Sequence, residues 1–121
     1  IQVSSNFERL LFEAMGRDGA AVSALMQSLK QSGAFTIPPG ALAAINADFG
    51  AATTDETQTG AEIAQTLSES GYLLDPHTAV GASVVRRHNA DPTPMVTLAT
   101  AHPAKFPAAV KAATGIEPAL P

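Results

Sequence analysis

Residues 95–106 read MVTLATAHPAKF and follow a turn-rich stretch at residues 89–94. The apolar run over residues 95–99 is short and bounded, as expected of a strand that is buried on both faces in a parallel sheet. Thr100 and His102 are the polar residues that come directly after it. Because ligands bind at the carboxyl ends of strands in open α/β sheets, this stretch predicts a strand that ends at a ligand site.

Helix signals lie before and after this run. Capping residues followed by apolar residues at helical spacing predict helices that begin at or next to Ser5, Asp18, Pro39, Asp55, Asp75 and Pro107. Ser5 with Glu8, and Asp55 with Gln58, have the spacing of a capping box. Glycines are expected to end four of these helices, at Gly16, Gly33, Gly71 and Gly115.

Other short segments complete the predicted sheet. Residues 35–37 are a strand candidate, residues 1–3 read as the stub of another strand, and residues 49–53 are a brief strand or a loop. Helices that alternate with two or three short parallel strands define an α/β fold. So few strands would leave both edges of the sheet bare, and the first residue is not Met. We therefore expect residues 1–121 to be one undivided segment of a larger α/β domain.

Composition excludes several classes of function. The formal net charge is −4, with no cluster of Lys or Arg and no Trp, so nucleic acid is not an expected partner. No apolar run approaches the roughly 20 residues that cross a bilayer, and nothing reads as a signal peptide, which predicts a cytoplasmic protein without a membrane partner. The absence of Cys excludes disulfides and cysteine-ligated zinc, and the three His residues lack metal-ligand spacing, so no metal is expected.

The first candidate ligand segment is the predicted start of the first helix. Ser4 and Asn6 lie where the strand stub turns into the helix, and Arg9 follows one turn later. Hydroxyl, N–H and guanidinium groups at this spacing can hold a phosphate. The alternative is that Ser5 only caps the helix and that Arg9 is a solvated surface residue.

Two further candidate segments lie later in the chain. His77 and Thr78 begin a helix and either face the same edge of the sheet or belong to a simple cap. Thr100 can exchange one hydrogen bond with a ring nitrogen, or it is an ordinary hydroxyl at a strand end. His102 is read as a turn histidine next to proline, and Lys105 is either a surface lysine or, if desolvated, a Schiff-base nucleophile.

Three stretches together resemble a known family. They are residues 4–13 (SSNFERLLFE), 71–81 (GYLLDPHTAVG) and 98–106 (LATAHPAKF). In this order and at these separations they are similar to the carboxy-terminal part of the threonine synthases of bacteria and fungi. The resemblance spans nearly the whole chain, and the third stretch is its most specific part.

The resemblance implies a segment of the large domain of a fold type II pyridoxal-phosphate enzyme. Such an enzyme converts O-phosphohomoserine and water to threonine and phosphate, with the cofactor as electron sink. By this resemblance Thr100 would donate a hydrogen bond to the pyridine nitrogen. Ser4, Asn6 and Arg9 match positions that line the substrate-phosphate side of the pocket.

The resemblance also implies that this segment is incomplete as a catalyst. In the family, the Schiff-base lysine and the glycine-rich cup for the cofactor phosphate lie upstream of it, and Lys30, Lys105 and Lys111 have a different context. We therefore expect no catalytic residue in this chain, no covalent cofactor and no activity without the remainder of the enzyme. The alternatives are another fold type II enzyme, such as a threonine dehydratase, or a non-catalytic helical interaction module.

Overall fold

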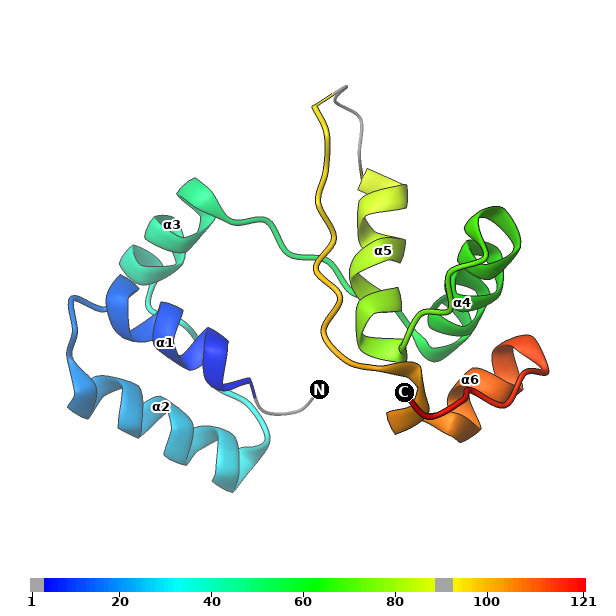
Figure 1. Cartoon of the computed structure of the whole chain (residues 1–121). Helices are drawn as coiled ribbons and strands as arrows, with labels where there is room; N and C mark the ends of the chain where they lie inside the picture. The colour runs from blue at the N-terminus through cyan, green and yellow to red at the C-terminus, as the bar shows by residue number, and fades with distance from the viewer. Residues whose placement is uncertain (1–3, 89–92) are drawn as a thin grey trace. The chain divides into compact units, whose positions relative to one another are not determined.

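The computed structural model describes residues 4–88 and 93–121, and within these ranges the chain is helical without a β-strand (Figure 1). The described helices are α1 (Ser5–Ala14), α2 (Gly19–Ser32), α3 (Pro39–Asp48), α4 (Glu56–Ser70), α5 (Pro76–His88), the 3-10 helix η1 (Pro103–Lys105) and α6 (Pro107–Thr114). None of these helices is long and apolar enough to cross a membrane.

The prediction of an α/β fold with short parallel strands is wrong for the described part of the chain. Residues 35–37 and 95–99 form no strand there, residues 49–53 are a loop, and residues 1–3 lie outside the described ranges. A strand persists only when a neighbour pairs its backbone N–H and C=O groups and another layer covers its side chains. The described residues provide neither a pairing strand nor a covering layer for the apolar run, in which Val96 and Leu98 are 81% and 75% exposed.

The predicted helix ends are largely confirmed. The Asp18 side chain caps α2, and Asp55 and Gln58 form the predicted capping box of α4 with N···O distances of 2.8 and 3.1 Å. Helices α2, α4 and α6 end at glycines with φ of 75°, 73° and 75°, namely Gly33, Gly71 and Gly115. Glycine adopts this left-handed conformation without a steric cost, so it stops a helix cleanly.

The start of α1 differs from its prediction by one residue. The cap is Ser4, whose Oγ accepts the N–H of Phe7 at 3.4 Å, while Ser5 is already the first residue of the helix. The predicted box between Ser5 and Glu8 is therefore wrong. Two adjacent serines each carry a hydroxyl that can cap the helix, and the local sequence does not show which of the two does so.

The chain divides into two compact units, Ile1–Ala51 and Ala52–Pro121. In the first unit, Leu11 of α1, Val22 of α2 and Ile45 of α3 form a buried cluster, with partly buried aromatic and aliphatic residues packed around it. Each helix thus contributes one side of its apolar stripe to a small core.

In the second unit, α4 packs against both α5 and α6. Its core contains Ile63 of α4 together with Leu74 and Ala79, which flank the start of α5. A Cβ atom placed on Gly60 would lie 3.9 Å from the Cβ of Ala113, so small residues let α4 and α6 approach closely. The start of α5 belongs to this core, and the residues around it are therefore fixed in place.

Candidate functional site

The start of α5 and the end of the apolar run meet in the second unit. The backbone N–H of Thr100 donates to Oγ1 of Thr78 at 2.9 Å, and the two Oγ1 atoms are 3.4 Å apart. These residues are 22 positions apart in the sequence. The structure thus brings together two of the three segments that the sequence singled out as candidate ligand segments.

Asp75 is the buried centre of this arrangement, with only 1% of its surface exposed. Its Oδ1 accepts the backbone N–H groups of His77 at 2.9 Å and Thr78 at 3.3 Å, which caps α5. Its Oδ2 accepts the hydroxyl of Thr78 in a short hydrogen bond. A carboxylate at a helix amino terminus is also favoured by the helix dipole. Asp75 therefore joins the predicted cap and the predicted ligand segment in one network.

His77 lies beside this network and is only partly buried. Its Nδ1 is 3.6 Å from Oδ1 of Asp75, and its ring meets the ring of Phe106 edge-on at a centroid distance of 4.8 Å. The Phe106 contact ties the segment after η1 to the start of α5. Edge-to-face packing is a favoured arrangement for a pair of rings at this distance.

His102 and Lys105 lie in the turn that contains η1. The Nδ1 of His102 accepts the N–H of Ala104 at 3.2 Å, so its side chain caps η1, as expected of a turn histidine. Lys105 is exposed. Lys111 is paired with Glu117 at 2.7 Å, and Lys30 lies at the end of α2 in the first unit.

Ser4, Asn6 and Arg9 lie in the first unit, at the start of α1. Ser5 and Arg9, together with Lys30 from α2, line an open groove of about 660 Å³ between α1 and α2. Glu8 also lines it, so the groove carries both signs of charge. The grouping of these residues with Thr100 in one substrate pocket stays a prediction.

The apolar run before Thr100 extends along α5. The methyl Cγ2 of Thr97 lies 3.4 Å from the position that a Cβ atom on Gly81 would take, so the run passes close to the helix there (Figure 1). Its larger side chains remain exposed, including Met95 at 56%. An exposed apolar stretch of this kind is unusual on a free surface.

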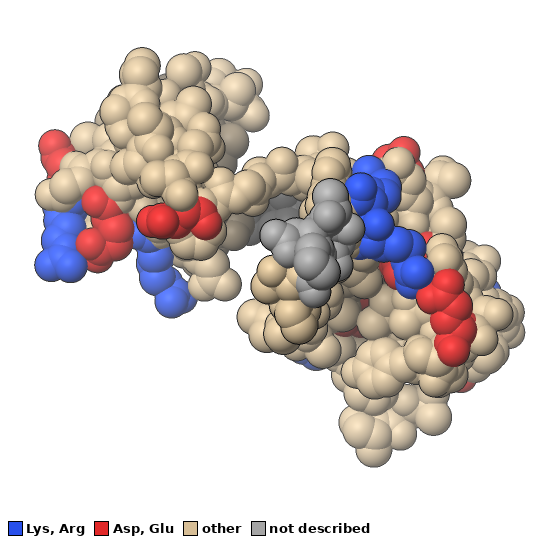
Figure 2. All heavy atoms as spheres, turned by 90° about the horizontal axis from the view of Figure 1, so that it is seen from above, with Lys and Arg blue, Asp and Glu red and all other residues tan. Residues whose placement is uncertain are grey.

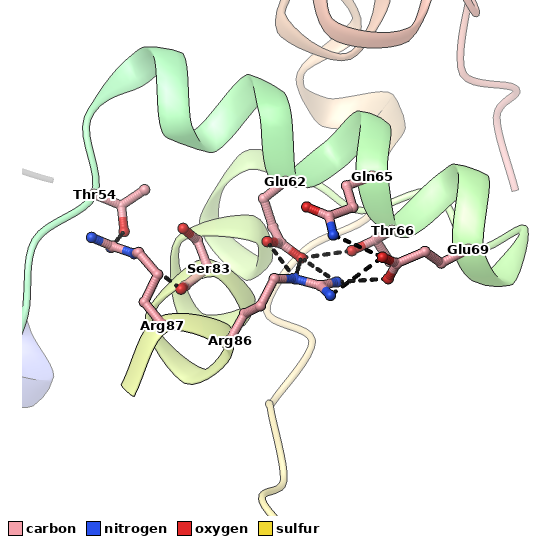
Figure 3. A network of polar contacts seen from close by, with 8 residues as sticks. All are labelled: Thr54, Glu62, Gln65, Thr66, Glu69, Ser83, Arg86 and Arg87. Atoms are coloured by element: carbon pink, nitrogen blue, oxygen red, sulfur yellow. Dashed lines mark hydrogen bonds and ion pairs between the residues drawn. The ribbon is translucent and has the colours of Figure 1, made fainter. Parts of the chain in front are cut away.

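A polar network between α4 and α5 was missed from the sequence (Figure 3). Arg86 of α5 donates to the buried Glu62 at 3.1 Å and to the exposed Glu69 at 2.9 Å, both on α4. The hydrogen bonds to Glu62 and then to Glu69 raise the pKa of Arg86 above its ordinary value. The pKa of Glu69 is lowered, first by the hydrogen bond from Gln65 and then by that from Arg86.

Arg86 and Arg87 lie in the last turn of α5, where basic residues suit the helix dipole. The pairing of Arg86 with Glu62 spans 24 positions and has no local signal. Its consequence is structural, because it clamps α5, which carries Thr78, onto α4.

Charge is mixed on the one face that Figure 2 draws. Basic side chains stand there next to acidic ones in both units and do not gather into one basic area. Among residues 4–88 and 93–121, no three His, Asp or Glu side chains are grouped so that they could hold a metal ion.

Known proteins match this chain along its whole length. A family profile described as "Threonine synthase, C-terminal" matches residues 78–121. The threonine synthase of Pseudomonas aeruginosa is 46% identical over the whole of this chain. The chain is homologous to the carboxy-terminal part of threonine synthase. It spans 26% of the length of that relative.

Two solved threonine synthase structures resemble the chain. A crystal structure described as PLP-bound threonine synthase from Brucella melitensis is 61% identical with a TM-score of 0.81, and the match covers 100% of this chain and 26% of that one. The crystal structure of the yeast threonine synthase is 32% identical with a TM-score of 0.70, over 93% of this chain and 26% of that one. The predicted resemblance to this family is thereby confirmed.

Proposed function

We propose that this chain is the carboxy-terminal quarter of a cytoplasmic, pyridoxal-phosphate-dependent threonine synthase, which converts O-phosphohomoserine and water to threonine and phosphate. The observation that carries the proposal is the 61% identity to a PLP-bound threonine synthase over the entire chain. The contact between Thr78 and Thr100 supports it, because it joins two of the stretches on which the resemblance rests. The partner of this segment is then the remainder of the enzyme chain.

The described residues fit one contact to the cofactor. Thr100 is exposed, and its hydroxyl has only a long 3.4 Å approach to Thr78, so its proton is available to a ring nitrogen. When bound, pyridoxal phosphate supplies the electron sink for the reaction. Thr100 would hold the pyridine nitrogen through a neutral hydroxyl, which donates its proton in a hydrogen bond and leaves the nitrogen unprotonated.

The remaining contacts of the cofactor belong to the rest of the enzyme in this proposal. None of the three lysines of the chain lies in the Asp75, Thr78 and Thr100 network. The Schiff-base lysine and the phosphate cup are therefore expected upstream. The isolated chain is expected to be inactive for the same reason.

Ser4, Asn6 and Arg9 are proposed to hold the phosphate group of the substrate. A helix start presents N–H groups that no residue of the helix satisfies, and a nearby guanidinium can bind two phosphate oxygens at once. Arg9 lies one turn into α1, on the groove between α1 and α2, and is exposed. Its side chain is therefore free to reach a bound anion.

A chimera tests the proposal directly. The carboxy-terminal quarter of the Brucella melitensis enzyme is replaced by this chain, and phosphate release from O-phosphohomoserine is measured. We expect activity within about tenfold of the unaltered enzyme, because 61% identity preserves most packing contacts. The matched control is a chimera with Thr100→Val, which should lose most of this activity. A chimera that folds, binds pyridoxal phosphate and yet releases no phosphate would refute the proposal.

A further inference from the structure

Thr100 ends an extended run that has little support of its own. The apolar side chains before it are exposed, and the described part of the chain provides no paired strand that would fix its backbone. The N–H of Thr100, however, donates to Oγ1 of Thr78 at 2.9 Å. A residue of α5 therefore sets the position of Thr100.

The direction of each hydrogen bond follows from counting protons. An ionised carboxylate can only accept, so the hydroxyl of Thr78 must donate its single proton to Asp75. The oxygen of Thr78 is left with its lone pairs, and one of them accepts the N–H of Thr100. Thr78 cannot also donate to Thr100. The proton on Thr100 therefore has no strong acceptor here and is free for another group.

The first member of this chain of hydrogen bonds is held rigidly. Asp75 is buried, and its other oxygen accepts two backbone N–H groups at the start of α5. Thr78 is 4% exposed, and the neighbouring Ala79 is completely buried in the core of the second unit. The carboxylate and the hydroxyl are therefore both shielded from water and held by the packing of the second unit.

We propose that Asp75 and Thr78 are positioning residues for Thr100: the buried carboxylate orients the Thr78 hydroxyl, and that oxygen fixes the backbone of Thr100 so that its own proton points to the cofactor ring. This inference rests on the proposed function, since it assigns the same contact between Thr100 and the ring nitrogen. Asp75 and Thr78 themselves touch neither cofactor nor substrate in this arrangement.

The test uses the full-length enzyme and pyridoxal phosphate itself. The variants are Thr78→Val, which keeps the shape and removes the hydroxyl, Thr78→Ser, which keeps the hydroxyl, Thr100→Val, and the double variant Thr78→Val with Thr100→Val. The apoenzymes are titrated with pyridoxal phosphate, and the dissociation constant and the visible absorption band of the bound cofactor are recorded. Far-UV circular dichroism confirms that each variant is folded.

A positioning role gives a distinctive pattern. Thr78→Val should weaken cofactor binding by about three- to tenfold, the range of one hydrogen bond, and should shift the visible band in the same direction as Thr100→Val does. Thr78→Ser should restore both to near the wild-type values. In the double variant, Thr78→Val should add nothing to the effect of Thr100→Val, because it acts through Thr100.

Failure of the inference and failure of the proposed function look different. The positioning role is overturned, and the proposed function stands, in either of two cases. In the first, Thr100→Val weakens cofactor binding but Thr78→Val does not. In the second, Thr78→Val raises the dissociation constant by the same factor in the Thr100→Val background as in the wild type. If Thr100→Val binds pyridoxal phosphate as the wild type does, the contact between Thr100 and the ring nitrogen, which belongs to the proposed function, is wrong, and the positioning role fails with it.

Discussion

Replacing Arg86 by Met should loosen α5 from α4. Arg86 reaches from the last turn of α5 to Glu62 and Glu69 on α4, and Glu62 is only 5% exposed (Figure 3). Without the guanidinium, Glu62 keeps the hydrogen bond from the hydroxyl of Thr66 at 2.8 Å but has no cation among the described residues. A buried carboxylate that loses its cation bears the full cost of its desolvation.

The size of the effect lies between two limits. Breaking a fully buried ion pair costs about 3–5 kcal/mol, whereas exposed pairs contribute about 0–1 kcal/mol. The Arg86 side chain is 41% exposed, so water screens the pair on that side. We therefore expect Arg86→Met to lower the free energy of unfolding by about 2 kcal/mol. For a chain of 121 residues, an unfolding entropy of about 2.1 cal/mol/K per residue converts such a loss into a fall in Tm of roughly 8 °C.

Urea denaturation of the 121-residue chain, followed by far-UV circular dichroism, measures this loss. The matched control is Arg87→Met, which makes the same charge change one residue later. Arg87 donates to the backbone oxygens of Ser83 and Thr53 and to the hydroxyl of Thr54. Its replacement therefore leaves no buried carboxylate without a cation. Combining Arg86→Met with Glu62→Gln should recover part of the loss. Equal effects of the two arginine substitutions would refute the reasoning.

Three further predictions concern the substrate, the cofactor and pH. In the full-length enzyme, Arg9→Ala should raise KM for O-phosphohomoserine by about tenfold or more, as the loss of a charged hydrogen bond does. The control Arg17→Ala, on the same segment, should leave KM unchanged. An unchanged KM for Arg9→Ala would remove Arg9 from the pocket. Mixing the isolated chain with pyridoxal phosphate and adding borohydride should leave no protein-bound absorbance, and a retained band would show that a lysine of this segment reacts. The pKa of Glu69 lies below its ordinary value of 4.5 because of its hydrogen bonds from Gln65 and Arg86. The contribution of Glu69 to stability is therefore complete above about pH 4.5 and is lost as the pH falls further. Glu69→Gln should flatten the acid limb of a plot of Tm against pH, and a limb of unchanged slope would contradict this.

The helix ends were predictable because their signals are local. A cap such as that of Asp18 or Asp55 and a left-handed glycine such as Gly71 act within three or four residues of the helix end, so the sequence contains both partners side by side. The ambiguity between Ser4 and Ser5 is also local. The family could be predicted for a related reason, since each of its three stretches is a short contiguous motif.

The strand prediction failed because a strand depends on pairing with segments that are distant in the sequence. Residues 95–99 have the composition of a buried strand, yet the described ranges contain no segment that pairs with them. Composition reports what a segment can pack against, and the neighbours decide whether it does. The same apolar run is therefore a helix-flanking, exposed segment in this chain.

The sequence by itself determined the helices, most of their caps and the family, all of which depend on residues a few positions apart. Only the tertiary structure decided that Thr78 and Thr100 meet, because that contact joins residues 22 positions apart. The pairing of Glu62 with Arg86 was decided in the same way. Hydrogen bonds between distant segments form only where packing of the helices brings the groups within about 3 Å, and no spacing rule in the sequence encodes that distance.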